Sequence, residues 1–472
     1  MAFYNRRAFL QASAAGFLGA TGALSGLGRS QAFAASTTGY KAMVGVFFKG
    51  GVDMFDALLP RDQANYDKLV GLRGGVINSH ADGSRDPDNQ LALNPSNTDL
   101  GTRRFGLAPE LGRTAELFNS GEAAIVGNVG PLLVPTDRAG MESGASSLPA
   151  NLFSHNDQQS TWMAFGPEGQ RAGWGGLMMD EVIRGGGLSR PEFGTLTAGS
   201  GDVFLASTRT TTFKVPRNPQ DLDVDMVRNA WPTSGTHGAA ARERLADYLR
   251  RSADGSPNRF ARDVIAAQSR GLTNLQSYKE AYSSVGALGA TFPDTRIGRQ
   301  LEAVANAIHI RGAVGNSRQV FYVDQGGFDT HDEQGQSIGG PLGQTFDAIA
   351  AFRDAMIATN AWDDVCLFTM SDFGRTLTDN GDGTDHGWGS HHFVFGGSVA
   401  GGRIYGQMPE LEADSARYTA QRARLIPTTS VDQYAATIGS WFGLDSREID
   451  RVLPNLSRFD GRDLGFMGGG AV

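Results

Sequence analysis

The stretch Ala42-Met43-Val44-Gly45-Val46-Phe47-Phe48 runs directly into Lys49-Gly50-Gly51-Val52-Asp53. Its apolar, β-branched and aromatic residues are typical of a β-strand, and the glycine pair ends that strand abruptly. An acidic side chain follows where the chain leaves the strand. The stretch therefore predicts a first strand that carries an aspartate beyond its carboxyl end.

Four further apolar runs repeat this pattern, at residues 123–129, 319–323, 365–370 and 393–395. Helix-like segments at residues 109–119 and 342–359 lie between them. Strands that alternate with helices are typical of an α/β domain with a largely parallel sheet. The predicted fold class is therefore α/β, built on a mostly parallel sheet.

The N-terminal segment has the features of an export signal. Asn5-Arg6-Arg7-Ala8-Phe9-Leu10-Gln11 contains paired arginines, and Ala32-Phe33-Ala34 supplies the small residues that a signal peptidase requires. The weakly apolar stretch between them is interrupted by glycines, so it does not suit a transmembrane helix. We expect residues 1–34 to engage the twin-arginine export machinery and to be removed. The mature protein would then have no stable membrane span and would be periplasmic or secreted.

Composition narrows the class of protein further. The chain has 42 Lys and Arg against 50 Asp and Glu, a net charge of −8, which disfavours nucleic acid as a partner. Cys366 is the single cysteine, so no intramolecular disulfide forms. We expect residues 35–472 to form one α/β domain. An insertion or cap is predicted at about residues 188–276, where the pattern of strands and helices changes.

Three aspartates stand at the ends of predicted strands: Asp53, Asp329 and Asp372. In an open α/β sheet, ligands bind beyond the carboxyl ends of the strands, because the loops converge there. For any one of these residues, the alternative is an ordinary turn or helix-capping aspartate. Their shared placement nevertheless indicates a functional site at this edge of the sheet.

Histidines gather near the same strand ends. Half of the eight histidines lie there, namely His331, His386, His391 and His392, and Asp385 directly precedes His386. Imidazole and carboxylate groups are preferred ligands of zinc and manganese. The predicted cofactor is therefore one or two divalent metal ions, zinc first, with manganese, calcium and magnesium as alternatives. For the last three histidines, the other interpretation is a loop whose imidazoles bond to backbone carbonyls.

Ser154 stands before a helix-like stretch at residues 155–162. A serine at such a place is first of all an N-cap. The functional interpretation is a nucleophile whose pKa is lowered by the helix dipole and by an adjacent metal. The one Gly-x-Ser-x-Gly pattern, at residues 335–339, follows a polar run rather than a strand, which disfavours an α/β-hydrolase.

Several of these motifs together resemble the exported domain-of-unknown-function family numbered 1501. They are the twin-arginine start, residues 48–56, Ser154-His155 before a tryptophan, and the segments 327–331, 371–376 and 384–387. They occur in the family's order over almost the whole mature chain. That family is in turn similar to the alkaline phosphatase and sulfatase superfamily. The resemblance implies a three-layer, alkaline-phosphatase-like α/β/α sandwich that hydrolyses phosphate or sulfate esters.

The resemblance also implies a set of metal ligands. Asp53 would be the first-strand ligand, Asp329 and His331 would hold one ion, Asp385 and His386 would lie across the site, and His391 or His392 would be the last histidine. Asp372 competes with Asp385, because the Asp-His pair of the superfamily follows its strand directly. Either aspartate, or both, would bind.

The chain also departs from the superfamily. The formylglycine motif Cys-x-Pro-x-Arg is absent, which excludes sulfatase chemistry of that type. Asp-Ser-Ala occurs only at residues 414–416, after all the predicted ligands, so the nucleophile rests on Ser154. His155 and Arg375 are candidates to steady the anionic group of the substrate, although a structural ion pair suits Arg375 equally well.

The predicted function is an exported, metal-dependent hydrolase that acts on small anionic phosphate or sulfate esters. The alternative is a non-catalytic exported protein that helps to assemble a surface or secreted complex. In that protein the metal site would only stabilise the fold or would be vestigial.

Overall fold

We analysed a computed structural model of the chain, which describes residues 39–201, 203–215, 217, 240, 244, 247, 248 and 258–468. The predicted signal at residues 1–34 and much of the predicted insertion lie outside the described residues. Within the described part, none of the helices combines the length and apolar character that crossing a bilayer requires.

The main sheet has nine strands in the order β11-β5-β10-β9-β1-β8-β6-β7, and β12 pairs with β5. These strands are β1 (Lys41–Phe48), β5 (Ala123–Gly130), β6 (Thr195–Thr197), β7 (Phe213–Lys214), β8 (Arg318–Gln325), β9 (Val365–Ser371), β10 (Ser390–Phe395), β11 (Ile404–Gly406) and β12 (Thr429–Ser430). β1 is parallel to β8 and β9, whereas β10 is antiparallel to β5 and β9. The predicted α/β class with a mostly parallel sheet is confirmed.

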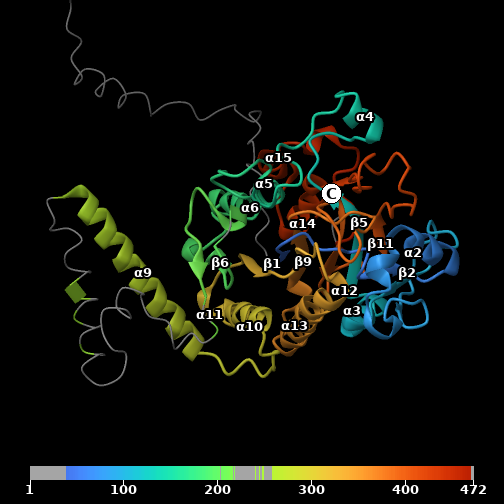
Figure 1. Cartoon of the computed structure of the whole chain (residues 1–472). Coiled ribbons are helices and arrows are strands. Elements are labelled where there is room, and N and C mark those ends of the chain that lie inside the picture. Colours follow the sequence, from blue (N-terminus) through green and yellow to red (C-terminus); the bar gives the residue numbers. More distant parts are fainter. Residues whose placement is uncertain are drawn as a thin grey trace, which may run out of the picture. The chain divides into compact units, whose positions relative to one another are not determined.

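Helices cover both faces of this sheet (Figure 1). Because successive strand residues point to opposite faces, Val44 and Val46 of β1 join one core with α10 (Arg296–His309) and α13 (Gly339–Ala358). Met43 and Phe47 join a second core with α6 (Trp174–Arg184), α14 (Val431–Phe442) and α15 (Ser446–Val452). The fold is therefore a three-layer α/β/α sandwich.

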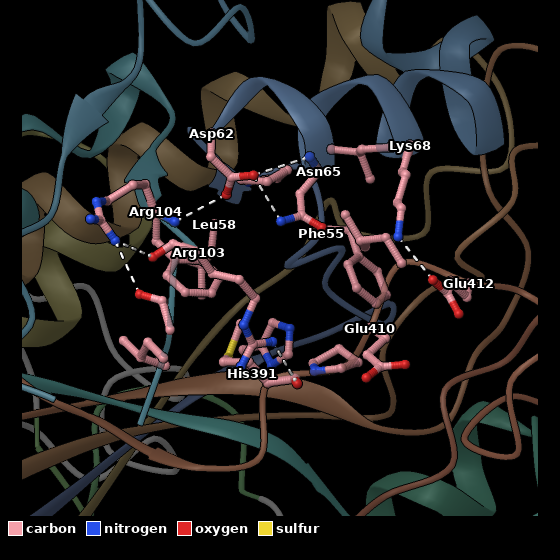
Figure 2. Close-up of a pocket in the computed structure, with 18 of the residues that line it drawn as sticks. Phe55, Leu58, Asp62, Asn65, Lys68, Arg103, Arg104, His391, Glu410 and Glu412 are labelled. Carbon is pink, nitrogen blue, oxygen red and sulfur yellow. Dashed lines mark hydrogen bonds and ion pairs between the residues drawn. The ribbon is translucent and has the colours of Figure 1, made fainter. Parts of the chain in front are cut away.

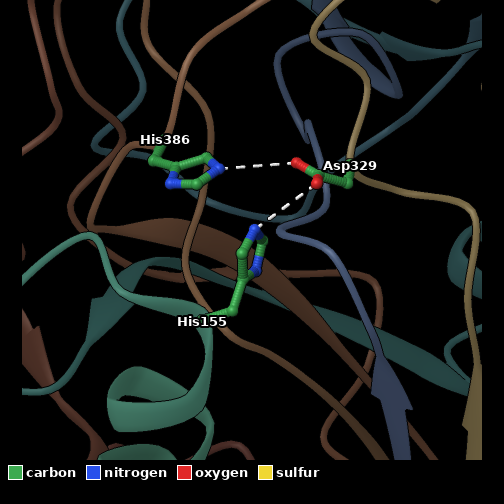
Figure 3. Close-up of side chains that lie close together, drawn as sticks. All are labelled: His155, Asp329 and His386. Atoms are coloured by element: carbon green, nitrogen blue, oxygen red, sulfur yellow. Dashed lines mark ion pairs between the residues drawn. The ribbon is translucent and has the colours of Figure 1, made fainter.

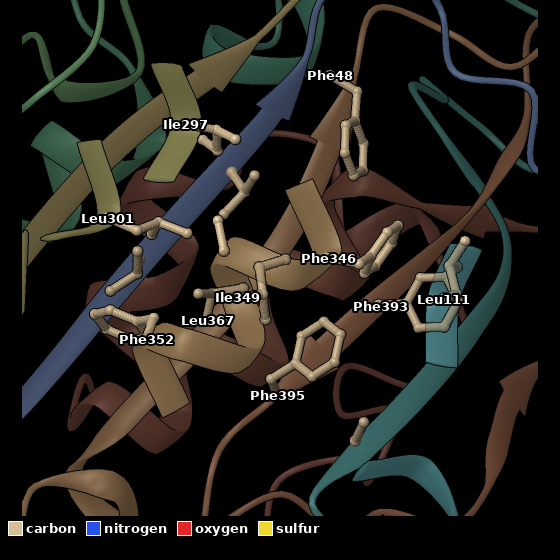
Figure 4. Close-up of a cluster of buried hydrophobic side chains, with 14 of the residues drawn as sticks. Phe48, Leu111, Ile297, Leu301, Phe346, Ile349, Phe352, Leu367, Phe393 and Phe395 are labelled. Atoms are coloured by element: carbon tan, nitrogen blue, oxygen red, sulfur yellow. The ribbon is translucent and has the colours of Figure 1, made fainter. Parts of the chain in front are cut away.

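Aromatic side chains fill the first core close to the carboxyl end of β1 (Figure 4). The ring centroid of Phe346 lies 6.0 Å from that of Phe48 and 5.2 Å from that of Phe393. Buried rings at such distances stabilise by area and by geometry. They fix the point from which the loop after β1 leaves the sheet.

Part of the predicted insertion extends the main sheet. β6 is parallel to β8, and β7 is parallel to β6. The helix α9 (Arg259–Ser283) contributes Tyr278, whose ring centroid lies 5.3 Å from that of Phe213. The described portion of this region thus forms an edge of the sheet together with a helix packed on it.

Shorter elements surround the three layers. They are the small sheet β2 (Leu58–Pro60), β4 (Phe105–Leu107) and β3 (Leu91–Ala92), and the helices α2 (Gln63–Ile77), α3 (Gly112–Asn119), α4 (Arg138–Glu142), α5 (His155–Ala164), α11 (Arg311–Val314) and α12 (Gln334–Ser337). The helix predicted at residues 109–119 begins as a 3₁₀ turn, Pro109–Leu111, and continues as α3.

Candidate metal centre

Four side chains converge beyond the carboxyl ends of β1, β8 and β9. Asp329 and His331 follow β8, His155 is the first residue of α5, and His386 lies in the loop between β9 and β10. Figure 3 shows His155 and His386 pointing toward the carboxylate of Asp329. We call these four residues the His/Asp cluster.

His155, Asp329 and His386 each offer one ligand atom, and these atoms lie within 4.8 Å of one another, as the ligands of one ion do. Nε2 of His155 lies 3.5 Å from Oδ2 of Asp329, and Nε2 of His386 lies 3.4 Å from Oδ1. Nε2 of His331 lies 3.1 Å from the same Oδ1 and 2.8 Å from Nε2 of His386. Tetrahedral zinc with bonds of about 2.1 Å separates its ligand atoms by roughly 3.4 Å.

One atom of the cluster has no hydrogen-bond partner. Nε2 of His155 is buried and unpaired among the described residues. An unsatisfied buried polar atom is costly and calls for an explanation, such as an ion. The imidazole and carboxylate donors of the cluster therefore fit a divalent metal such as zinc.

The other ring nitrogen of each histidine has a polar neighbour, which is a hydrogen-bond partner for His155 and His386. Nδ1 of His155 lies 2.6 Å from Oδ2 of Asp372, and Nδ1 of His331 lies 3.5 Å from Oδ1 of Asp385. Nδ1 of His386 donates to the carbonyl oxygen of Phe153 over 2.8 Å. Such partners fix the tautomer and orientation of metal-binding imidazoles. Because His386 donates from Nδ1, its Nε2 lone pair is directed into the cluster, where it accepts from Nε2 of His331.

Asp372 is the most deeply buried of these anchors. Its side chain is 0% exposed, and it also accepts from Nε2 of Gln159 at 2.9 Å and from the backbone N–H of Gly50 at 3.3 Å. Its hydrogen bond to His155 raises the pKa of that imidazole above the ordinary value, against the effect of burial. Asp372 therefore acts on the cluster through His155.

Phe153 adopts a backbone conformation that is unusual for a bulky residue. Its φ is 73°, in the left-handed region, and this conformation accompanies the hydrogen bond from His386. The guanidinium of Arg424 lies 4.1 Å from the centre of its ring, and Nε of Arg424 donates to the carbonyl of His386. Such strain persists only where the surroundings over-determine it, often at functional sites.

A hairpin-like return brings Asp385 and His386 back to the end of β9. The backbone N–H of Thr376 donates to the carbonyl of Asp385 at 3.0 Å, and that of Gly387 donates to the carbonyl of Gly374 at 2.8 Å. Residue 387 must be glycine, because a Cβ would lie 2.6 Å from the Gly374 oxygen. Asp372 and Asp385 thus both border the cluster, one at His155 and the other at His331.

Asp329 combines partial exposure with a stabilised negative charge. Its side chain is 50% exposed, and its Oδ1 accepts from a terminal nitrogen of Arg375 at 2.5 Å. Burial alone would raise its pKa, but the hydrogen bond and charge of Arg375, with the charges of His155 and His331, hold the pKa below the ordinary value. The carboxylate is therefore ionised and open to solvent.

The guanidinium of Arg375 makes its hydrogen bonds to other groups of the protein. Its guanidinium is fully buried and donates to the carbonyl oxygens of Gly51, Thr384 and Phe328 at 2.8, 3.0 and 2.9 Å, and also to that of Gly50. These contacts join the loops after β1, β8 and β9. Arg375 has the position of a structural tie between the ligand-bearing loops.

Asp53 lies apart from the cluster, in a buried ion pair. Both of its carboxylate oxygens accept from the guanidinium of Arg73, at a kink in α2, and Oδ2 also accepts from Nε2 of Gln334 at 2.7 Å. Its negative charge is thus balanced by a guanidinium. The geometry does not bring Asp53 to the other predicted ligands.

Gln334 connects this buried pair to the cluster. Its amide donates to Asp53 and Asp56, and its oxygen accepts from the hydroxyls of Thr330 at 2.9 Å and Thr384 at 2.7 Å. Thr330 lies between Asp329 and His331, and Thr384 directly precedes Asp385. One side chain therefore steadies both ligand-bearing loops.

His391 and His392 also lie apart from the cluster, on opposite faces of β10. Nδ1 of His391 accepts from the backbone N–H of Asn128 at 3.1 Å, and the ring of His392 packs 4.9 Å from that of Trp162. Burial lowers the pKa of His391 to about 4, and burial with the His391 charge lowers that of His392 to about 3. Both are neutral core residues, since strand alternation directs them into the sheet's two faces.

His391 borders a separate cavity of about 430 Å³ (Figure 2). The lining mixes charges of both signs: Lys68, Arg103 and Arg104 against Asp62, Asp99, Glu410 and Glu412. No residue of the His/Asp cluster lines this cavity.

Ser154 directly precedes His155 but makes no N-cap hydrogen bond to the helix backbone. Its Oγ donates to Oδ2 of Asp157 at 2.8 Å. The Ser154 hydroxyl therefore neither caps the helix nor bonds to the cluster.

Sequence reasoning missed the position of His155 as a potential ligand. The sequence suggested contact with the substrate anion, whereas the fold directs Nε2 of His155 at Asp329. The sequence signal for this ligand position is the order Ser154-His155 at the start of a helix, which places an imidazole beside the loops at the end of the sheet. Its anchor, Asp372, is 217 residues away.

A family model described as a protein of unknown function (DUF1501) matches residues 40–453. No curated protein sequence matches the chain. Among solved structures, the chain is similar to the C-terminal periplasmic domain of EcEptC from Escherichia coli, with 9% identity, coverage of 90% and 89% of the two chains and a TM-score of 0.33. It is similar to the lipoteichoic acid synthase LtaP from Listeria monocytogenes, with 7% identity, coverage of 86% and 72% and a TM-score of 0.31. It is also similar to the PsFucS1 sulfatase from Pseudoalteromonas sp., with 9% identity, coverage of 92% and 73% of the two chains and a TM-score of 0.34. At these scores, function has to be argued from the chain's own residues.

Proposed function

The chain belongs to the DUF1501 family, as its motifs predicted, and we propose that it is an exported metal-dependent hydrolase of phosphate or related esters, such as sulfates. The observation that carries this proposal is the His/Asp cluster. Three imidazole nitrogens and one carboxylate meet there, and the other nitrogens of His155 and His386 are hydrogen-bonded to Asp372 and to the Phe153 carbonyl.

We propose that the cluster holds one divalent ion, with zinc preferred. His155, Asp329 and His386 offer ligand atoms within 4.8 Å of one another, and Nε2 of His331, 3.1 Å from Asp329 and 2.8 Å from His386, is the fourth donor that we assign. Asp53, the predicted first-strand ligand, is already paired with Arg73 and adds no donor for a second ion. When bound, such an ion polarises an ester oxygen and lowers the pKa of a bound water or hydroxyl.

The exposed side of the cluster suits an anionic ester. The side chains of Asp329 and His331 are 50% and 39% exposed, so small molecules reach them from solvent. Asp372, Asp385 and the Phe153 carbonyl hold the imidazoles in place while the substrate enters and leaves. These anchors contribute orientation rather than contact with the substrate.

Ser154 is the proposed nucleophile, with a water as the alternative. Its hydroxyl proton is directed at Asp157, which leaves the lone pairs of Oγ available. The hydrogen bond from Ser154 and the backbone N–H of Glu168 lower the pKa of Asp157, so that carboxylate is ionised and orients the Ser154 hydroxyl by accepting its hydrogen bond.

The decisive experiment combines metal analysis with turnover. Purified wild-type protein is expected to contain about one zinc ion per chain and to hydrolyse p-nitrophenyl phosphate or sulfate. Asp329→Ala should lose both the ion and the activity, whereas Asp347→Ala, an exposed carboxylate on α13, should retain both. A fully metal-loaded protein that turns over no ester faster than Asp329→Ala would rule out the hydrolase.

Such a result would support the second candidate, a non-catalytic exported protein that assists assembly of a surface or secreted complex. One observation favours it: the Ser154 hydroxyl and the Arg375 guanidinium are both bonded to the protein itself. In that case a bound ion contributes only to the stability of the fold.

We also propose export through the twin-arginine machinery, supported by Arg6-Arg7 and by the small residues Ala32 and Ala34 at the predicted cleavage site. Replacing both arginines by lysine should leave the uncleaved precursor in the cytoplasm. Cleavage and export at the wild-type level would exclude this route.

A further inference from the structure

A second cavity lies at the same edge of the sheet as the His/Asp cluster, about 510 Å³ in volume. Its walls come from the residues that follow β6 and β7 and from the first turns of α10. Four basic residues line it: Lys214, Arg217, Arg296 and Arg299. Among the residues that the structure describes, no carboxylate belongs to this lining. The three arginines pair with three acids beside the cavity, Asp294, Glu302 and Asp324, so the four cations outnumber these three acids by one, in a chain whose net charge is −8.

Most of these cations are held in place by acids outside the cavity. Arg296 donates to Asp324 at 2.7 Å, and Arg299 donates to Asp294 at 2.9 Å. Their side chains are still 55% and 43% exposed. Lys214 is exposed and has no ion pair among the residues that the structure describes. The guanidinium groups are thus positioned, while donors remain available to a ligand.

The cavity is joined to the cluster through one short segment. Asp324, at the end of β8, bonds to Arg296 on the cavity side and to Lys49 on the side of β1. Asp329 follows five residues later on the same loop. Since β6 lies two strands from β1 and neighbouring strands are about 4.8 Å apart, the two sites are separated by roughly 10–15 Å.

We propose that this basic cavity binds a second anionic group of the same substrate, so that the substrate class is a polyanion with repeated sulfate or phosphate groups. This inference rests on the proposed ester hydrolysis at the cluster. One ester group lies at the cluster while another, about 10–15 Å along the molecule, pairs with Lys214 and the arginines. Guanidinium groups suit both sulfate and phosphate oxygens, because their N–H groups form paired hydrogen bonds.

The test measures binding separately from turnover. Sucrose octasulfate, a compact polyanion, is titrated calorimetrically into metal-free protein at low salt. The double variant Lys214→Glu/Arg299→Glu should bind it at least about tenfold more weakly, because two positive charges become negative. Arg447→Glu/Arg451→Glu makes the same change in charge on α15, across the sheet from α10, and should bind like the wild type.

Equal loss in both double variants would mean that net charge alone governs binding, and equal affinity in all three proteins would mean that the cavity takes no anion. Either result overturns the inference. Failure of the proposed function looks different: no ester is hydrolysed, yet octasulfate still binds at the cavity. Conversely, p-nitrophenyl esters could be hydrolysed while octasulfate neither binds the protein nor inhibits the reaction. That result would leave the hydrolase intact and reject the polyanionic substrate.

Discussion

Replacing Asp372 by asparagine tests whether the anchors control the cluster. The carboxylate accepts from His155, Gln159 and the Gly50 N–H, and it is fully buried. An asparagine has the same shape but only one acceptor oxygen. If that oxygen faces His155 and Gln159, its NH₂ group opposes the N–H of Gly50. If the amide is turned over, NH₂ opposes His155.

The expected magnitude follows from these contacts. A hydrogen bond to a charged group contributes about 1.5–3 kcal/mol, and loss of an outer partner of a metal-binding histidine weakens metal binding by about 10–100-fold. We therefore expect Asp372→Asn to bind zinc about 10–100-fold more weakly than the wild type. Competition with a chromophoric chelator at neutral pH measures this affinity directly.

The matched control is Asp180→Asn on α6. Asp180 is also buried and accepts several hydrogen bonds, from Ser207, Thr208 and Arg209, but it lies in another part of the fold. The Asp180→Asn variant should bind zinc with the affinity of the wild type. A folded Asp372→Asn protein whose zinc affinity stays within about twofold of the wild type would refute the anchoring argument.

Three further predictions concern the buried polar groups. Gln334→Leu leaves the Thr330 and Thr384 hydroxyls without their acceptor. Urea denaturation should show that the free energy of unfolding falls by about 1–3 kcal/mol per unsatisfied group, and zinc should bind more weakly. Unchanged zinc affinity would show that Gln334 does not act on the cluster. Arg73→Met leaves the charge of Asp53 buried and unpaired and should lower the unfolding free energy by about 3–5 kcal/mol, and a loss below about 1 kcal/mol would contradict the ion pair. His391 and His392, with pKa values of about 4 and about 3, stay neutral in the fold but ionise near pH 6.5 when unfolded, so stability should fall as the pH drops from about 6.5 to 4.5, by about 2–3 kcal/mol for each. His392→Gln should reduce that loss, and an equal loss in the variant would contradict the assignment.

Much of the scaffold could be predicted from the sequence, because each strand has a recognisable local pattern of apolar residues. The run after residue 40 and the run before Ser371 are both apolar and both end in small or acidic residues, and they pair in parallel as β1 and β9. Periodicity within a short window carries that information. The loops at their ends carry no such pattern.

The site was harder to predict, because residue type does not reveal direction. Asp53, Asp329 and Asp372 look alike in the sequence, yet one is paired with Arg73, one faces the cluster and one orients His155. Only the three-dimensional neighbours decide among these roles. Likewise, strand β10 directs His391 and His392 into its two faces, which a count of histidines near strand ends cannot reveal.

The interlocked anchors make the cluster a cross-link between distant parts of the chain. The carbonyl of Phe153 accepts from His386, Asp372 bonds to His155 across 217 residues, and Asp385 lies 3.5 Å from Nδ1 of His331. Only the folded chain assembles all of them, so an ion bound there acts on folding by mass action, adding about 2.7 kcal/mol when free metal exceeds its dissociation constant a hundredfold. The melting temperature of this protein would then report the free zinc concentration of the compartment around it.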